Sequence, residues 1–186
     1  DRGRIYRLVS PEMKRHRPER LGDMPIVKLA SYLNHDNAWH RMTAMRLLDE
    51  RNDRSVEHAL YSIVSDSNKA VGRMQALYAL QNLQLLRPLH IRQGIKDEHP
   101  RVRTHSVKLA ESFLSERLSE DILSDLLPLI DDTSEHVRFQ LAFTLGESAD
   151  DRAITGLARI LLDARNGKDI QSAVLSSASG MADKLA

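Results

Sequence analysis

The sequence predicts an all-α protein: a right-handed α–α superhelix of about five helical hairpins, preceded by a short extended N-terminal segment. An apolar helical stripe recurs at near-constant spacing through most of the 186 residues. A second apolar helix pattern precedes each stripe, and polar turns join the two. Since a pair of short helices cannot bury its apolar face alone, neighbouring pairs are expected to stack into a continuous core.

The recurring stripe is clearest in residues 131–147. Side-chain oxygens of Asp131 to Ser134 are expected to accept hydrogen bonds from the first turn of the following helix. The apolar positions of that helix repeat with a period of 3.6 residues: Val137, Leu141, Thr144 and Leu145. The pattern aligns on anchor residues 30 to 35 positions apart: His40, Gly72, Val102, Val137 and Ile170. Small or aliphatic residues lie four, seven and eight positions after every anchor, as close helix packing requires.

The first helices of the hairpins are predicted at 25–33, 55–64, 88–95, 119–130 and 153–163. Pro25 suits the first turn of a helix, whereas Pro128 should kink or tighten the last turn of its helix. Polar turns are expected at 35–38, 66–68, 97–100, 131–134 and 164–168. The second helices are expected to line the concave side of the superhelix.

The first 23 residues differ from the rest, so the solenoid is placed at 24–186. Residues 1–9 alternate like a β-strand without a later partner, which predicts the end of a preceding domain. Residues 10–23 hold two prolines and four basic side chains: Lys14, Arg15, Arg17 and Arg20. We interpret this run as a solvated linker, with a phosphate-binding patch as the alternative.

The composition favours a soluble helical protein, with 41% apolar, 28% charged and only 4% aromatic residues. A net charge of +1 provides no global field to attract nucleic acid or an anionic membrane. The lack of cysteine removes disulfides, thiolate metal sites and thiol catalysis. No apolar run is long enough to span a bilayer. Because the sequence stops within a helical pattern, we expect it to be part of a longer protein.

A turn aspartate followed by a Val-Arg pair occurs twice: Asp97 with Val102-Arg103, and Asp132 with Val137-Arg138. This motif resembles the HEAT repeat family, and the resemblance covers roughly residues 24–186. The Val-Arg pair is replaced in the other repeats by His40-Arg41, Gly72-Arg73 and Ile170-Gln171. The resemblance implies an interaction scaffold without catalytic groups.

Four stretches carry a narrower resemblance: GRIYRLV at 3–9, LNHDNAWHRMTAMRLLDER at 33–51, QLAFTLGE at 140–147 and AVLSS at 173–177. They are similar to planctomycete-type membrane-bound dehydrogenases, in which a sugar-dehydrogenase-like β-propeller precedes a HEAT region and a cytochrome c domain often follows. The resemblance implies that residues 1–9 end the propeller and that the parent is an exported or periplasmic oxidoreductase. It places no catalytic residue here, and no Cys-x-x-Cys-His motif is present to hold haem.

Four arginines directly follow the anchors: Arg41, Arg73, Arg103 and Arg138. We interpret them as structural groups that bond turn carboxylates or carbonyls, such as those of Asp97 and Asp132, within or between repeats. The planar guanidinium fork suits such acceptors. Binding of phosphate groups is the alternative.

No pattern in the sequence predicts a catalytic, cofactor or metal site. His35 and His40 lie five residues apart and His99 and His105 six apart, and neither spacing is that of a helical metal pair. The carboxylate pairs Asp49-Glu50 and Asp131-Asp132 fall at helix ends and turns, where nothing demands a raised pKa. No phosphate loop, nucleophile elbow or dinucleotide motif occurs.

Positions two and six after each anchor point away from the buried stripe. We predict that these positions form a protein-binding patch on the concave face: Met42, Arg46, Met74, Tyr78, Lys108, Phe139 and Phe143. Exposed Met and aromatic side chains of this kind mark interaction sites. The alternative is that packing between repeats covers them. Phe139 and Phe143 are the strongest pair because they lie four residues apart on one helix.

The predicted function is therefore a non-catalytic scaffold that binds another protein or neighbouring domains of the same chain. A nucleic-acid-binding module, similar to the helical-repeat DNA glycosylases, is the first alternative. It needs a basic concave stripe, to which Arg46 and Lys108 contribute few charges. An enzyme active by itself is the second alternative, and it needs clustered titratable groups in a cleft.

Overall fold

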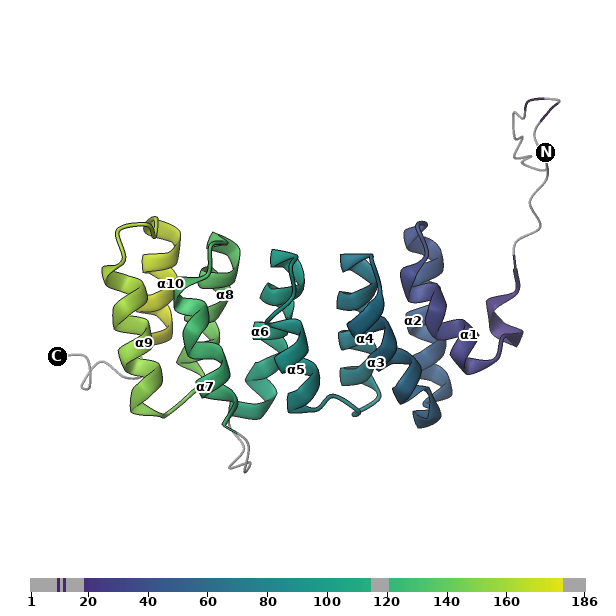
Figure 1. Cartoon of the computed structure of the whole chain (residues 1–186), viewed down its shortest axis with the longest axis horizontal. Coiled ribbons are helices and arrows are strands. Elements are labelled where there is room, and N and C mark those ends of the chain that lie inside the picture. The colour runs from purple at the N-terminus through teal and green to yellow at the C-terminus, as the bar shows by residue number, and fades with distance from the viewer. Residues whose placement is uncertain (1–9, 11, 13–18, 115–120, 179–186) are drawn as a thin grey trace, which may run out of the picture.

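The computed structural model describes residues 10, 12, 19–114 and 121–178. Every regular element in these residues is an α-helix or a 3₁₀ helix, which confirms the predicted all-α solenoid for this part of the chain. The β-strand predicted at 1–9 and most of the basic run at 10–23 lie outside the described residues. The helical hairpins follow one another in a single row, from the N-terminal end at the right of Figure 1 to the C-terminal end at the left.

Each hairpin of the described chain pairs a first helix with a second helix, and in all but the last hairpin the second helix is the longer one. The first helices are α1 (Ile26–Ser31), α3 (Glu57–Asp66), α5 (Pro88–Gly94), α7 (Ile122–Leu126) and α9 (Asp151–Leu162). The second helices are α2 (Ala38–Arg51), α4 (Ala70–Asn82), α6 (Pro100–Leu114), α8 (Glu135–Gly146) and α10 (Lys168–Ala178). Short 3₁₀ helices adjoin them: η1 (Leu21–Asp23), η2 (Tyr32–Asn34), η3 (Arg54–Val56) and η4 (Leu127–Asp131).

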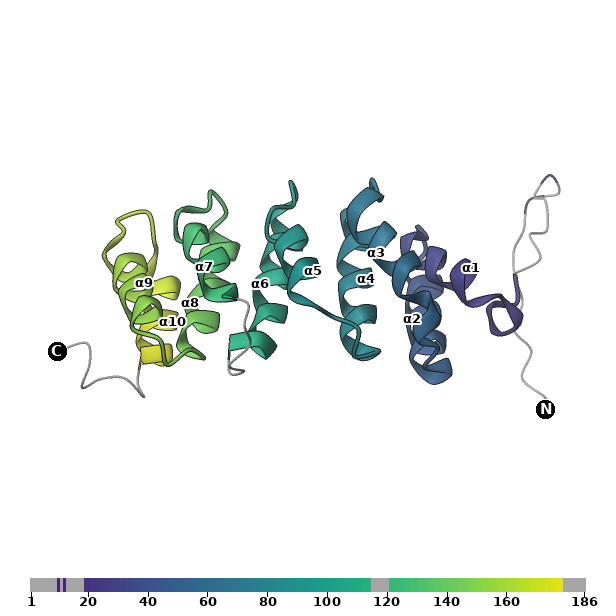
Figure 2. The same ribbon diagram turned by 60° about the horizontal axis from the view of Figure 1, so that its bottom comes forward.

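The hairpins stack through two layers, and the second helices pack side by side from α2 to α10. Figure 2 shows the same row after a turn of 60°, and each hairpin again lies between its neighbours in sequence. The side chains four positions after the anchors are all buried in this layer: Ala44, Ala76, Ser106, Leu141 and Val174. We call the outer surface of α2, α4, α6, α8 and α10 the second-helix face.

Pro128 shapes the first helix of the fourth hairpin as the sequence predicts. The α-helix ends at Leu126, and the chain continues as the 3₁₀ helix η4, in which Pro128 lies in the first turn. A proline has no amide hydrogen and its ring crowds the preceding turn, so the tighter helix takes over at this point.

The N-terminus of α8 is capped differently from the prediction. Ser134 is the N-cap residue, but its side chain makes no capping hydrogen bond. Instead, the Asp132 carboxylate accepts a hydrogen bond from the Ser134 amide at 2.8 Å, one step before the helix begins. The prediction that these side chains cap the first helical turn is therefore wrong at Ser134, because the turn closes on the aspartate.

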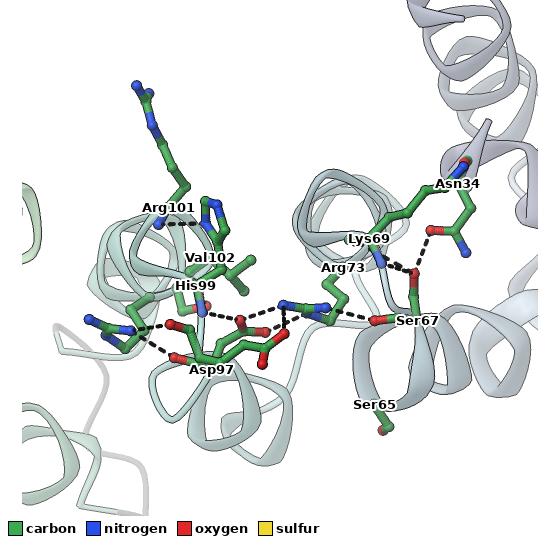
Figure 3. Close-up of polar contacts among 12 residues, drawn as sticks. Asn34, Ser65, Ser67, Lys69, Arg73, Asp97, His99, Arg101 and Val102 are labelled. Carbon is green, nitrogen blue, oxygen red and sulfur yellow. Dashed lines mark hydrogen bonds and ion pairs between the residues drawn. The ribbon is translucent and has the colours of Figure 1, made fainter. Parts of the chain in front are cut away.

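Gly72 stands at the anchor position of the second hairpin, where the Asn34 side chain of the first hairpin lies too close for a Cβ atom. A Cβ atom at this position would lie 1.5 Å from the Asn34 side-chain oxygen. That oxygen accepts a hydrogen bond from the Ser67 hydroxyl at 2.7 Å, as Figure 3 shows. A glycine at the anchor position thus lets the turn of the first hairpin approach the turn of the second.

The packed core extends back to the last residues of the predicted linker. Leu21 is buried, and the Arg51 guanidinium donates hydrogen bonds to the carbonyl oxygens of Gly22 and Met24, both at 2.5 Å. These contacts attach η1 to the end of α2.

Candidate functional site

Each of the four arginines after the anchors binds the turn that precedes its own helix. The Nη1 atom donates to a carbonyl oxygen six residues earlier in every case, at 2.8 Å, 2.7 Å, 2.8 Å and 2.6 Å from Arg41, Arg73, Arg103 and Arg138 respectively. The shared geometry closes the turn between the two helices of a hairpin.

Three of these arginines also reach the turn of the next hairpin. Arg73 donates from Nε and Nη2 to the Asp97 carboxylate at 2.6 Å and 2.7 Å, a two-pronged contact visible in Figure 3. Arg103 binds Asp132 in the same way at 2.7 Å and 2.8 Å. We call Arg73, Arg103, Arg138 and their acceptors the arginine ladder. Because its donors face turn acceptors, the ladder ties successive hairpins together.

The last described rung uses an amide in place of a carboxylate. Arg138 donates from Nε to the Asn166 side-chain oxygen at 2.7 Å, and the Asn166 amide group donates to the Ile160 carbonyl at 2.8 Å. Sequence reasoning missed Asn166 because it lies four residues before its anchor, whereas Asp97 and Asp132 lie five before theirs. The polar turn at 164–168 was the available signal.

The first and second hairpins are joined by a different set of contacts. Ser67 occupies the turn position that Asp97 and Asp132 hold in later hairpins, so Arg41 finds no carboxylate there. Lys69 instead binds the Asp36 carboxylate at 2.6 Å and the Asn34 carbonyl at 3.1 Å. At the other end, Gln171 stands where a further arginine would continue the ladder.

The predicted contact residues separate into exposed and half-buried groups. Met42 is 69% exposed on α2, and Arg46 and Lys108 also face solvent. Met74 and Tyr78 are half-buried against the core, which agrees with the alternative that packing between repeats covers these positions. The Tyr78 hydroxyl lies 2.8 Å from His105 Nδ1 on the neighbouring helix α6. Burial raises the pKa of Tyr78 and lowers that of His105.

Phe139 and Phe143 form an exposed aromatic pair beside a groove. Both rings are 37% exposed on α8, and they meet edge to face with centroids 5.1 Å apart. They form one wall of an open groove of about 620 Å³ between α8 and α10. The other lining residues are Glu135, His136, Asp169, Ser172, Ala173 and Ser176. The two rings therefore present an apolar surface beside a wall of small side chains.

Sequence reasoning missed the acidic end of this groove and a further exposed aromatic. Glu135, Phe139 and Phe143 are each four residues apart, so the helical period alone could have placed Glu135 beside the rings. Trp39 is exposed next to Met42 on α2, in the position just before its anchor. The meeting of Asp169 with Glu135 depends on how α10 packs beside α8.

A second hollow of about 570 Å³ lies on the opposite layer, between α3 and α5. Arg54, Glu57, Tyr61 and Leu89 contribute to its lining, and the Arg87 guanidinium forms an ion pair with Glu57. His90 is buried at its floor and accepts a hydrogen bond from the Arg87 amide at 2.9 Å. Burial lowers the pKa of His90.

Two further features bear on function. Within the described ranges, no three His, Asp or Glu side chains gather so that they could hold a metal ion. None of the helices in the described part of the chain combines the length and apolar character needed to cross a bilayer.

Stacked helical hairpins whose turns are bridged by arginines define the class of the molecule: it is a HEAT-like α-solenoid. The family model for HEAT repeats matches residues 88–178, which span α5 to α10. No curated protein matches the chain. The match supports the HEAT resemblance of the sequence, whereas the narrower likeness to membrane-bound dehydrogenases is not supported by it.

Proposed function

We propose that the chain is a non-catalytic scaffold that holds another protein, or a neighbouring domain, on its second-helix face. HEAT repeats commonly serve as protein-interaction scaffolds. The observation that carries the proposal is the groove between α8 and α10, where Phe139 and Phe143 remain exposed as an adjoining pair. Paired aromatic rings in an open groove are typical anchors of protein interfaces.

The buried charged groups support a structural role. Arg73 and Arg138 are almost fully covered, and their donors bind turn acceptors at hydrogen-bond distance. Asp97 and Asp132 are engaged in the same way. The most strongly buried charges thus hold the hairpins together, while the surface between α8 and α10 is left for contact.

A crosslinking experiment in the native host tests the contact surface. Benzoylphenylalanine replaces Phe139 in one protein and Leu89, on the opposite layer, in the control. We expect a discrete crosslinked partner at position 139 that is absent at position 89. Identical products at both positions would contradict a binding surface at the groove.

The partner identified in this way is then purified for a binding titration. We expect Phe139→Ser/Phe143→Ser to weaken its binding at least about tenfold, since buried aromatic anchors each contribute more than about 1 kcal/mol. The matched control is Tyr61→Ser/Leu89→Ser, which removes two exposed apolar side chains from the first-helix layer and should change the affinity less than about twofold. Equal losses in both variants would overturn the proposal.

The nucleic-acid alternative predicts a basic second-helix face. Arg46 on this face is paired with Glu50, and the groove between α8 and α10 carries Glu135 and Asp169 at one end. Carboxylates there repel phosphate groups. A titration with labelled DNA at low salt, followed across salt concentrations, would reveal the steep salt dependence of phosphate binding if it occurs.

We further propose, on the four similar stretches alone, that the parent protein is an exported dehydrogenase in which this solenoid separates a propeller from a cytochrome c domain. The full reading frame tests this proposal. A propeller before Asp1 and a Cys-x-x-Cys-His motif after Ala186 would support it, and any other neighbouring domains would contradict it.

A further inference from the structure

We propose that the groove between α8 and α10 accepts a partner segment that carries a Lys or Arg side chain at one end and apolar side chains next to it. This inference rests on the proposed function and adds the chemistry and direction of the ligand. It follows from the order of the side chains along the groove, from the lack of described side-chain partners for its two carboxylates, and from the shape of its apolar part.

The groove has two chemically different ends. Glu135, Phe139 and Phe143 follow one another at every fourth residue of α8, so they lie in line over about 12 Å of helix. Asp169 lies in the first turn of α10, and Ser172 and Ser176 follow it along that helix. Both carboxylates therefore lie at the end where the helices begin, and both phenyl rings lie beyond them.

Among the described residues, the two carboxylates have no side-chain partner. Neither Glu135 nor Asp169 forms a hydrogen bond or ion pair with another side chain in the part of the chain that the structure describes. The nearby Asp131, by contrast, is paired with Arg159 and Arg165 at 3.1 Å and 3.4 Å. Glu135 and Asp169 lie in the first turns of α8 and α10, a favourable position for an anion. Their oxygens are therefore available to a ligand.

The charges around this end favour a cationic ligand. His136 lines the groove beside the two carboxylates. Lys168 precedes Asp169 in the sequence but does not line the groove. Arg165 is held by Asp163 at 2.5 Å and by Asp131. With the neighbouring arginines engaged elsewhere, a Lys or Arg side chain from a partner is the complementary group for Glu135 and Asp169.

The rest of the groove suits apolar side chains. The edge-to-face rings of Phe139 and Phe143 form one side, and Ala173 with two serines forms the other. Small residues opposite two phenyl rings leave room for an aliphatic or aromatic side chain to be inserted. The cation fixes the direction of the segment, and apolar burial supplies most of the affinity.

Selection from a phage-displayed library of random 12-residue peptides tests the inference. The wild-type chain is the bait, and Phe139→Ser/Phe143→Ser is used for counter-selection after circular dichroism has shown that it folds. We expect the selected peptides to share a Lys or Arg next to apolar residues. The most frequent peptide, labelled with fluorescein, is then titrated by fluorescence anisotropy.

We expect Glu135→Gln/Asp169→Asn to weaken binding of that peptide about fivefold, since exposed ion pairs are individually modest, and to reduce its salt dependence. The control Asp49→Asn/Asp66→Asn removes the same charge from exposed sites elsewhere and should leave the affinity unchanged. Equal effects of both variants would overturn the assignment of Glu135 and Asp169.

The other outcomes separate the two proposals. Peptides that need Phe139 and Phe143 but share no basic residue would contradict the inference and leave the proposed function standing. A selection in which no peptide depends on the two rings would contradict both. Concentration-dependent dimers of the wild-type chain that the serine variant abolishes would show that a second copy, and not a basic segment, occupies the groove.

Discussion

The Arg73 side chain contacts three groups in two turns: the Ser67 carbonyl before its own helix, and the carboxylates of Asp97 and Glu98 in the next turn, the latter at 3.4 Å. Its pKa is raised by the hydrogen bond with Asp97. The planar fork makes this possible, because its fixed set of N–H donors binds both oxygens of the Asp97 carboxylate and the Ser67 carbonyl at once.

We predict that Arg73→Met lowers the free energy of unfolding by about 3 kcal/mol or more, because it leaves the buried Asp97 carboxylate without its guanidinium. Arg46→Met is the matched control. It removes an exposed ion pair with Glu50 on α2 and should cost less than about 0.5 kcal/mol. Urea unfolding followed by circular dichroism measures both. A loss for Arg73→Met as small as that of the control would show that the ladder does not stabilise the stack.

Asp132 gives the ladder a predictable pH dependence. Burial opposes its ionisation, but hydrogen bonds from Arg103 and the Ser134 amide outweigh that effect and hold the pKa of Asp132 below its usual value. A carboxyl group with a lowered pKa in the folded state stabilises the fold above its unfolded-state pKa of about 3.9. That contribution is lost as the pH falls from about 4 through the folded-state pKa.

We therefore expect Asp132→Asn to be less stable than the wild type at pH 7 and the difference to shrink below about pH 4. Urea unfolding of both proteins between pH 7 and pH 2.5 measures this change. Parallel stability curves over the whole range would contradict a lowered pKa at Asp132.

At the scale of single elements, contacts between hairpins can override the repeat motif. Gly72 replaces the apolar anchor of the second hairpin because Asn34 of η2 approaches α4 at that point. Alanine favours a helix over glycine by about 1 kcal/mol, so an uncrowded glycine-to-alanine change within a helix would stabilise it. At Gly72, the steric conflict with Asn34 instead makes the change to alanine destabilising.

We predict that Gly72→Ala destabilises the protein by about 1–3 kcal/mol, the range typical of overpacking. Gly22→Ala, where a Cβ would meet nothing within 4 Å, should be nearly neutral. In a double-mutant cycle with Asn34→Ala, most of the Gly72→Ala cost should disappear. A cost that persists in the Asn34→Ala background would place the conflict elsewhere.

At the scale of the whole molecule, the same repeat position has different surroundings along the row. The residues five positions after the anchor are buried in the middle hairpins: Leu77, Val107 and Ala142. Leu175 occupies this position in α10 and is 61% exposed. The exposures differ because α8 packs beside α6, whereas no described element follows α10.

This difference predicts unequal costs for the same substitution. Val107→Lys places a charge between two helices and should lower the free energy of unfolding by more than about 3 kcal/mol. Leu175→Lys should change it by no more than about 0.5 kcal/mol. Thermal and urea unfolding of the two variants measure the contrast. Comparable losses would mean that another part of the chain covers Leu175.

The sequence indicated the helices and turns because their signals are local. The 3.6-residue stripes, Pro128 and the polar turns each act within a few residues. Met74 and Tyr78 were expected on the surface because helical geometry alone cannot tell how closely the next helix approaches. Asn166 was missed because the fifth turn has a different spacing from the others. The groove could not be predicted as a whole, since Phe139 and Asp169 meet only across two hairpins.

The sequence by itself therefore determined that this protein is a row of helical hairpins with arginines at their turns, because periodic burial and turn chemistry are encoded in each repeat. Only the tertiary structure decided which side chains of different repeats meet. The register between neighbouring hairpins covers Tyr78, exposes Phe139 and brings two carboxylates to one end of the groove. That register depends on packing between residues about 30 positions apart, which no local pattern reports.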